Sequence, residues 1–373
     1  MSEGSGIDVA CIVVNYFCSK LTLEAVRSFH SQCPDGRIVV VDNSADESEQ
    51  LILSEGLPAN AQLIVQSQNI GFGGACNLAL SYCDEPMVLL INPDVILMSD
   101  CVAHLREALA SDPELSAVSP MQFWDRSFRW MLPPAWLPTG IGQWTLSAAH
   151  RNRRTARRLS RAYHSIALKL WSAGSESVVE QRALSGGAMM LRREAVATLG
   201  LLFDPTYFMY YEDSDLCLRF RRKGWKLAIA RSALVVHEWT HSEAKIAMME
   251  TSQAQYFEKN FSGQGQWETR LQRAVRESPL DGLLPAKKLA YGTAALPVPK
   301  DWQAGWVLEA GPSPLLIPAL GFIGSGASAD IDWSLMRRMG ETSHIFLRLC
   351  PLDSSCTDEL FYEVIPEKQS DPR

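Results

Sequence analysis

The chain has 373 residues, of which 47% are hydrophobic and 21% are charged, so it has room for one large α/β domain plus a smaller unit and is not expected to be disordered. Its formal net charge of -7 argues against general binding of nucleic acid. The nine cysteines are odd in number and scattered through apolar segments, which favours buried free thiols in a reducing cytoplasm over a disulfide framework or a zinc site.

Four apolar, β-branched runs in the first part of the chain predict buried strands of a mostly parallel sheet. These runs are 7–14, 37–41, 61–66 and 87–91. Amphipathic helices are expected at about 21–30 and 48–54, and a further helix after a glycine cluster at 69–77. Strand, helix and strand at this spacing indicate a right-handed βαβ unit. We therefore expect a Rossmann-like α/β sheet with flanking helices.

Three of these strands end in polar side chains suited to one cleft, namely Asn15, Asp42, and Asn92 with Asp94. In open α/β sheets, ligands bind at the carboxyl ends of the strands. Pro93 ends the fourth strand and presents Asp94 there. A carboxylate in that place suits Mg²⁺ or Mn²⁺ carrying a diphosphate. On this stretch alone, an Asx-Pro turn without a ligand is an equal alternative.

The glycine cluster at 69–77 (NIGFGGACN) stands at the start of an expected helix. Its glycines allow the backbone to approach a ligand closely, and its N–H groups lie where anions are favoured. The cluster follows the third strand rather than the first, so it is not the dinucleotide-binding GxGxxG. Taken alone, such a cluster is more often a plain loop.

Further along, three carboxylates crowd the start of an expected helix: Glu212, Asp213 and Asp215. The helix dipole favours one acidic residue there, but three behind a run of aromatic and Met residues exceed what a cap needs. Crowded carboxylates in a semi-apolar pocket are a means of tuning a general base. His237 follows two short predicted strands, 226–230 and 234–236. It is either a packed core residue or a metal ligand, and Asp94 favours the second because its cation needs further ligands.

Residues 151–171 have a helical composition that is strongly basic at first and apolar later. The basic residues are Arg151, Arg153, Arg154, Arg157, Arg158 and Arg161. Ile166, Leu168, Leu170 and Trp171 follow. Two interpretations are open: a solvated helix face or lid, or a peripheral contact with an anionic membrane. No apolar run reaches the ~18 residues of a membrane span, and the polar residues 1–6 do not form a signal peptide.

In chain order, these motifs resemble those of the inverting family 2 glycosyltransferases of GT-A fold, in particular bacterial rhamnosyltransferase-like members. The shared blocks are VVNY (13–16), VVDNS (40–44), NIGFGGACN (69–77), LLINPDV (89–95), SGGAMMLRREA (185–195) and FDPTYFMYYEDSDLCLRFRRKGW (203–225), followed by His237. The resemblance covers about residues 7–261. It implies a GT-A domain at 1–265 with a basic, Trp-rich insertion at about 123–180. Residues 266–373 are expected to form a small, β-rich extension.

The resemblance also implies the roles of single residues. The donor-binding set is Asn15, Asp42, Asn69, Gly71, Asn77 and Asn92, with Asp42 on the base of the nucleotide. Asn92-Pro93-Asp94 stands for the family's Asp-x-Asp motif, so Asp94 would face the metal, with His237 beside it. Asp213 would be the catalytic base. Gly186, Gly187 and Glu212 would line the junction between donor and acceptor.

We therefore expect a Mg²⁺- or Mn²⁺-dependent inverting glycosyltransferase, with dTDP-L-rhamnose as the preferred donor. Its acceptor would be a hydroxyl of a glycan, or of a glycan on a polyprenyl diphosphate, in bacterial surface-polysaccharide synthesis at the cytoplasmic face of the membrane. UDP-galactofuranose, UDP-N-acetylglucosamine and other UDP-hexoses fit the same motifs. A nucleotidyltransferase would carry a Gly-rich basic loop after the first strand, which 15–18 (NYFC) is not. A silent carbohydrate-binding protein on a GT-A scaffold is disfavoured because Asp94 and Asp213 are both present.

Overall fold

The structure, a computed structural model, describes residues 8–172, 174, 176–238, 243–262, 286–339, 344–353 and 358–365. Its larger part is a nine-stranded sheet with the order β3-β2-β1-β4-β8-β6-β9-β5, in which β7 also pairs with β9. The strands are β1 (Val9–Asn15), β2 (Arg37–Asp42), β3 (Ala61–Val65), β4 (Met87–Ile91), β5 (Val95–Leu97), β6 (Leu115–Phe123), β7 (Val178–Gln181), β8 (Ala188–Arg192) and β9 (Lys226–His237). Strands β1 to β4 are parallel to one another, as are β6 and β9, whereas β8 runs antiparallel to β4 and β6. The predicted α/β fold class is confirmed.

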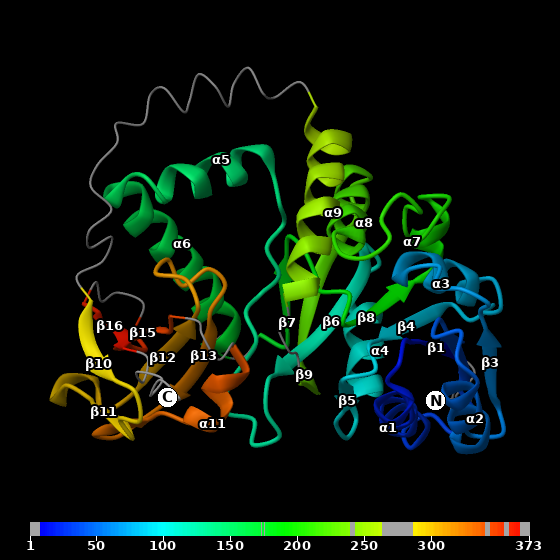
Figure 1. The fold of residues 1–373 in the computed structure, drawn as a ribbon, viewed down its shortest axis with the longest axis horizontal. Coiled ribbons are helices and arrows are strands. Elements are labelled where there is room, and N and C mark those ends of the chain that lie inside the picture. The colour runs from blue at the N-terminus through cyan, green and yellow to red at the C-terminus, as the bar shows by residue number, and fades with distance from the viewer. Residues whose placement is uncertain are drawn as a thin grey trace, which may run out of the picture.

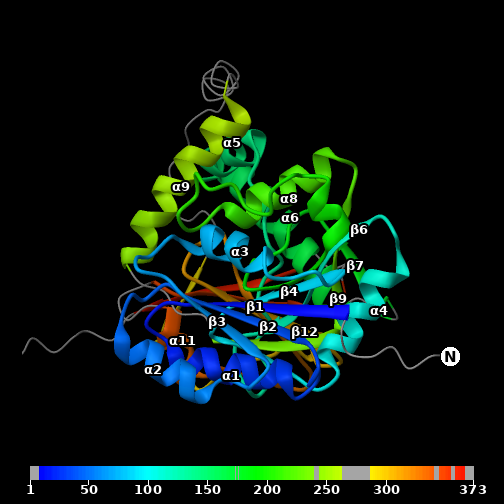
Figure 2. The same cartoon turned by 90° about the vertical axis from the view of Figure 1, so that its right-hand side faces the viewer.

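Helices cover both faces of this sheet. They are α1 (Ser19–His30), α2 (Glu47–Gly56), α3 (Phe72–Leu80), α4 (Cys101–Ser111), α7 (Arg193–Ala197), α8 (Glu212–Arg222) and α9 (Glu243–Phe261). Figure 2 shows α1 and α2 below β1 to β3, with α3 above them. Ala10 and Ile12 of β1 lie in the core between the sheet and α3. Cys11 and Val13 lie in the core on the other face, between the sheet and α1. A strand buried on both faces needs apolar residues at every position, which explains its unbroken apolar run.

The C-terminal part forms a second, smaller sheet with the order β10-β16-β15-β12-β13, on the left in Figure 1. Its strands are β10 (Lys287–Ala290), β12 (Trp306–Gly311), β13 (Leu320–Gly324), β15 (Phe346–Pro351) and β16 (Leu360–Ile365). The C-terminal part also contains a separate two-stranded sheet, β11 (Ala295–Pro297) with β14 (Ser328–Asp330). Its remaining elements are the helix α11 (Trp333–Met336) and the 3-10 turns η2 (Lys300–Trp302) and η3 (Arg337–Met339). The predicted β-rich extension is confirmed, while its predicted boundary at 265/266 lies outside the described residues.

The insertion packs on this second sheet through α6 (Arg153–Ser172), whereas α5 (Gly140–Ala149) packs against α6. Arg348 Nη1 of β15 donates to Ser160 Oγ of α6 at 2.9 Å. A Cβ atom on Gly321 of β13 would lie 2.3 Å from the Trp171 ring, so only glycine leaves room for this close contact. The insertion and the C-terminal sheet therefore pack directly against each other.

Three details of the prediction are corrected. Strands 226–230 and 234–236 are one continuous strand, β9. Within the predicted Trp-rich insertion, Gly140–Ala149 form a helix, α5, that was not predicted from the sequence. The apolar half of the basic segment is not a free surface, because Leu168, Leu170 and Trp171 are buried and only Ile166 is exposed, at 48%. Among the described residues, no helix has the length and apolarity required to cross a membrane.

Candidate active site

The carboxyl ends of the strands bring the predicted residues to one edge of the large sheet. Asn15 ends β1 and Asp42 ends β2. The two strands are parallel neighbours, and these two residues are paired with each other. Asn92 follows β4, and His237 ends β9. The short strand β5 pairs Val95 with His237, which places Asp94 beside the imidazole.

The predicted metal-binding pair is in contact. His237 Nε2 lies 3.4 Å from Asp94 Oδ1. His237 Nδ1 lies 2.9 Å from Gln122 Oε1, an acceptor that keeps the proton on Nδ1 and leaves the lone pair of Nε2 directed toward Asp94. Nε2 is buried and has no hydrogen-bond partner among the described residues. A carboxylate oxygen and an unpartnered imidazole nitrogen fit a divalent cation.

The loop 185–187 connects this pair to the predicted base. Asn92 N donates to Gly187 O at 2.8 Å. A Cβ atom on Gly187 would lie 2.6 Å from His237 Cε1, so the loop can run against the imidazole only as glycine. Gly186 N donates to Asp213 Oδ2 at 3.0 Å. The structure thus assembles Asn92, Asp94, His237, the two glycines and Asp213 in one continuous arrangement.

The first turn of α8 carries two carboxylates in different environments. Burial, followed by the charge of Asp213, raises the pKa of Glu212 to about 8. Burial also raises the pKa of Asp213, but hydrogen bonds from the Gly186 N–H and from Ser214 favour its charged form. Glu212 Oε2 has no hydrogen-bond partner among the described residues. These hydrogen bonds make Asp213 the member of the pair whose charged form is better stabilised, which suits a general base.

Asp215, the third carboxylate of the cluster, has a structural role. It is fully buried, and its Oδ2 accepts from Arg219 Nε at 2.8 Å. Its Oδ1 accepts from Lys259 Nζ at 2.7 Å and from Asn260 Nδ2 at 3.1 Å. These bonds connect α8 to α9. Of the three clustered carboxylates, Glu212 and Asp213 therefore belong to the candidate site, and Asp215 belongs to a structural ion pair.

At the donor side, Asp42 keeps one oxygen uncommitted. Its Oδ1 accepts from Asn15 Nδ2 at 2.9 Å and from Ser44 N at 3.0 Å. Its Oδ2 is buried without a hydrogen-bond partner in the described part of the chain. Asn15 is fully buried, and its Oδ1 accepts from Thr22 Oγ1 at 2.8 Å. Asn15 therefore orients Asp42, and its buried side chain exposes no surface to a ligand.

The glycine cluster is held against the segment that leads into α8. Gly71 has a φ of 79°, and a Cβ atom there would lie 2.4 Å from Phe208 O. Asn69 Oδ1 accepts from Gly71 N at 2.9 Å. The side-chain amide of Asn77 bonds both to Phe203 O and to Phe203 N. These contacts position the loop, and donor binding by Asn69, Gly71 and Asn77 stays a prediction.

Sequence reasoning missed several residues of the site. Gln122 sets the His237 tautomer, and no motif in the sequence pointed to it. Tyr210 and Tyr211 have φ values of 71° and 66°, a left-handed conformation that is costly for non-glycine residues and that turns the chain into α8. Tyr16 and Phe17, directly after β1, are exposed at 53% and 56%. Two aromatic residues at the end of the first strand were the available signal.

A separate group of potential metal ligands lies between α6 and the second sheet, where His164, Glu309 and Cys350 meet. Burial tends to raise the pKa of Glu309. The neighbouring Arg348 and His164 outweigh this effect and lower the pKa to about 2. Arg348 Nε donates to the Glu309 oxygen that also faces His164 Nδ1. A guanidinium already neutralises this carboxylate, so the group is a buried ion-pair network and a poor cation site.

Known proteins resemble this chain in sequence and in fold. Residues 6–258 match the profile of a family described as glycosyltransferase like family 2. The chain is 24% identical over 230 residues to an N-acetylglucosaminyl-diphospho-decaprenol L-rhamnosyltransferase found in two strains of Mycobacterium tuberculosis, CDC 1551 / Oshkosh and ATCC 25618 / H37Rv. The match covers 56% of this chain and 68% of the relative.

Two solved structures are similar in fold. One is GalNAc-T7 with UDP, GalNAc and Mn²⁺, with a TM-score of 0.50 and 13% identity over 76% of this chain. This chain spans about half of it, 53%. The other is a mannosyltransferase from Pyrobaculum calidifontis with GDP-Man and Mn²⁺, with a TM-score of 0.45 and 16% identity, covering 74% of this chain and 78% of that one. The likeness to GalNAc-T7 confirms the predicted GT-A fold and shows no more than the fold.

Proposed function

The chain belongs to the glycosyltransferase like family 2, and on that premise we propose that it is an inverting, Mg²⁺- or Mn²⁺-dependent enzyme that transfers a sugar from a nucleoside-diphosphate donor to a hydroxyl group. The observation that carries the proposal is the connection from Asp213 through Gly186 and Gly187 to His237 and Asp94. A candidate base and a candidate metal pair lie on opposite ends of one short glycine loop. A sugar placed over that loop would have a proton acceptor on one side and its leaving diphosphate on the other.

The chemistry follows from these groups. Asp213 accepts the proton of the acceptor hydroxyl as its oxygen attacks the anomeric carbon, and the bond from that carbon to the diphosphate breaks on the opposite face. A single base and in-line attack invert the configuration. Asp94 and His237 would hold the cation, which when bound neutralises the charge of the departing diphosphate. Asp42, with its uncommitted buried oxygen, would contact the base of the nucleotide.

The donor that we propose is dTDP-L-rhamnose. The support is the match to a relative that is named an L-rhamnosyltransferase, together with the rhamnosyltransferase-like motifs of this chain. The same relative acts by name on N-acetylglucosaminyl-diphospho-decaprenol, so we propose a glycan on a polyprenyl diphosphate as the acceptor, in surface-polysaccharide synthesis. Such an acceptor would place the reaction at the cytoplasmic face of a membrane.

A panel of nucleotide sugars tests the proposal. The unfolding temperature is measured with dTDP-L-rhamnose, UDP-galactofuranose, UDP-N-acetylglucosamine and other UDP-hexoses, with and without Mn²⁺. We expect the largest increase with dTDP-L-rhamnose and Mn²⁺ together, because a ligand that binds only the folded state stabilises it. A larger increase with a UDP-sugar would show that this sugar, and not dTDP-L-rhamnose, is the donor. Slow hydrolysis of the stabilising donor without acceptor, lost in Asp94→Ala, would exclude a silent carbohydrate-binding protein.

A further inference from the structure

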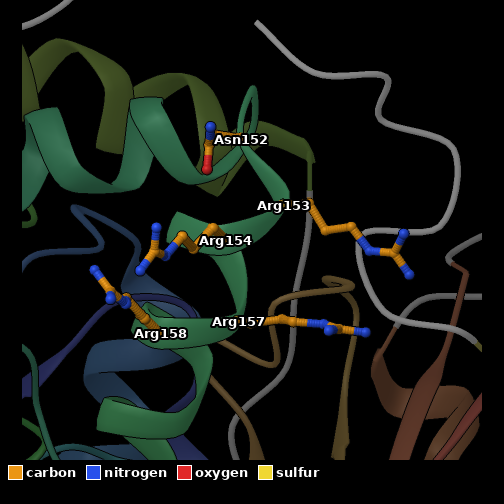
Figure 3. Close-up of a pocket in the computed structure, with 5 residues that line it drawn as sticks. All are labelled: Asn152, Arg153, Arg154, Arg157 and Arg158. Carbon is orange, nitrogen blue, oxygen red and sulfur yellow. The ribbon is translucent and has the colours of Figure 1, made fainter. Parts of the chain in front are cut away.

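The first turns of α6 carry a concentration of positive charge around a pocket of about 430 Å³. Its lining is formed by Asn152, Arg153, Arg154, Arg157 and Arg158, which we call the arginine pocket. Figure 3 shows Arg154 and Arg158 extending to one side of the helix and Arg153 and Arg157 to the other. The spacing of four residues within each pair explains this, because residues i and i+4 share a helix face.

This arrangement does not serve the stability of the helix. Cations near a helix N-terminus oppose the helix dipole, and like charges at i and i+4 repel. The first turn of α6 contains no acidic residue. Arg154, Arg157 and Arg158 form no ion pair with any residue of the described chain, whereas Arg161 farther along the helix pairs with Glu359 at 3.6 Å. A local conflict of this kind marks a place that is shaped by binding rather than by folding.

We propose that the arginine pocket binds a phosphate or diphosphate group. Guanidinium groups present planar pairs of N–H donors that match phosphate oxygens, and two of them on one helix face can grip one group from two directions. A bound dianion would also remove both the repulsion between the arginines and their conflict with the helix dipole. Arg154 and Arg158 form the pair that we assign to this role.

The arginine pocket is distinct from the candidate active site and shares no residue with it. It lies on α6, beside the C-terminal sheet, whereas Asp213 lies on α8 against the large sheet (Figure 1). Binding at the arginine pocket therefore does not depend on the proposed transferase activity. The phosphate could belong to a lipid headgroup or to a soluble molecule. Because Leu168, Leu170 and Trp171 are buried in the protein, a lipid would be held by its headgroup and not by a helix inserted among acyl chains.

The test compares a double variant, Arg154→Gln with Arg158→Gln, with a charge-matched control, Arg27→Gln with Arg338→Gln. Both control residues are exposed and lie far from the pocket in the chain. In one arm, calorimetry measures the binding of inorganic diphosphate. In the other, co-sedimentation measures binding to vesicles of phosphatidylglycerol and phosphatidylcholine, with phosphatidylcholine vesicles alone as the reference.

We expect the wild type and the control to bind in at least one arm, and the double variant to bind roughly tenfold or more weakly, because charge-assisted hydrogen bonds to both arginines are lost. The binding should weaken as salt rises. Binding of diphosphate alone identifies a soluble ligand, and binding of anionic vesicles alone identifies a headgroup. If the wild type binds in neither arm, or the double variant binds as well as the control, the proposal is overturned. The unfolding temperature of the double variant should not fall, so a lost fold cannot imitate the result.

Discussion

His237 Nε2 lies 3.4 Å from Asp94 Oδ1, although Asp94 directly precedes β5 and His237 ends β9, which is distant in the sequence. The contact exists because β5 pairs with β9 and places Val95 opposite His237. Gln122 holds the other ring nitrogen, so the lone pair of Nε2 faces the carboxylate. This geometry supports the cation site that we propose for the pair.

From this geometry we expect Asp94→Ala to nearly abolish turnover and to weaken donor binding while the protein stays folded. His237→Ala should raise the concentration of Mg²⁺ or Mn²⁺ that half-saturates the rate, because one ligand of the cation is removed. Titration of Mn²⁺ into chelator-treated enzyme measures this. His344→Ala, at an exposed imidazole just before β15 in the chain, is the control. Full activity in excess chelator would contradict the metal site.

The assignment of Asp213 as base predicts a loss of turnover rather than of binding. Proton abstraction by a positioned group contributes typically ~10²–10⁴-fold, so Asp213→Asn should lower kcat by about that factor. The Kd of the donor should change little, since our proposal places Asp213 at the acceptor hydroxyl rather than at the donor diphosphate. Steady-state rates and donor titrations on the same preparation separate the two. An active Asp213→Asn enzyme would refute the assignment.

Asp215 should behave differently from its neighbour. Asp215→Asn leaves Lys259 and Arg219 without their buried partner, and loss of one member of such a group costs several kcal/mol. We expect the free energy of unfolding to fall by about 3 kcal/mol, because both cations are partly exposed and recover some hydration. Urea denaturation measures it. Below its unfolding transition the variant should keep most of its kcat, and a lost kcat with unchanged stability would move the base to Asp215.

The two glycines of the loop should differ in their tolerance of a methyl group. Gly187→Ala brings its Cβ to 2.6 Å from His237 Cε1, which forces the imidazole or the loop to move. Gly186→Ala brings its Cβ only to 3.3 Å from Asp213 Cβ, a tight contact that a small shift relieves. Gly187→Ala should therefore raise the metal requirement strongly, and Gly186→Ala only slightly. Equal metal titrations for both variants would show that the loop does not position His237.

The raised pKa of Glu212 makes stability depend on pH. Burial disfavours its charged form, so its folded pKa of about 8 exceeds its unfolded value. Its contribution to stability is complete below the unfolded pKa and is lost as pH rises through about 8. Unfolding free energies measured from pH 5 to 9 should therefore decline toward the alkaline end, and Glu212→Gln should decline less. Parallel curves for the two proteins would mean that Glu212 ionises freely in the fold.

The sequence by itself determined the strands of the parallel half and the residues at their ends. Met87–Ile91 is the range predicted for β4, and the other three early strands differ by at most two residues at an end. A short run of branched apolar residues favours a strand that is buried on both faces, and Pro93 favours its end at that point. For the same local reason, Asp94 could be singled out without knowledge of the fold, whereas the choice of Asp213 within its cluster of three carboxylates came from the resemblance to the family.

Tertiary structure alone decided how those side chains are used. Asp213 and Asp215 have the same chemistry and nearly the same place in the sequence, yet one meets Gly186 and the other meets Lys259. Gln122, the glycine loop and His237 come together only through the order and register of β6, β8 and β9. The apolar half of α6, expected to face a membrane or solvent, is buried against a sheet formed by the end of the chain. Local pattern sets period and exposure within an element, whereas the partner of a side chain depends on which distant strand or helix packs against it.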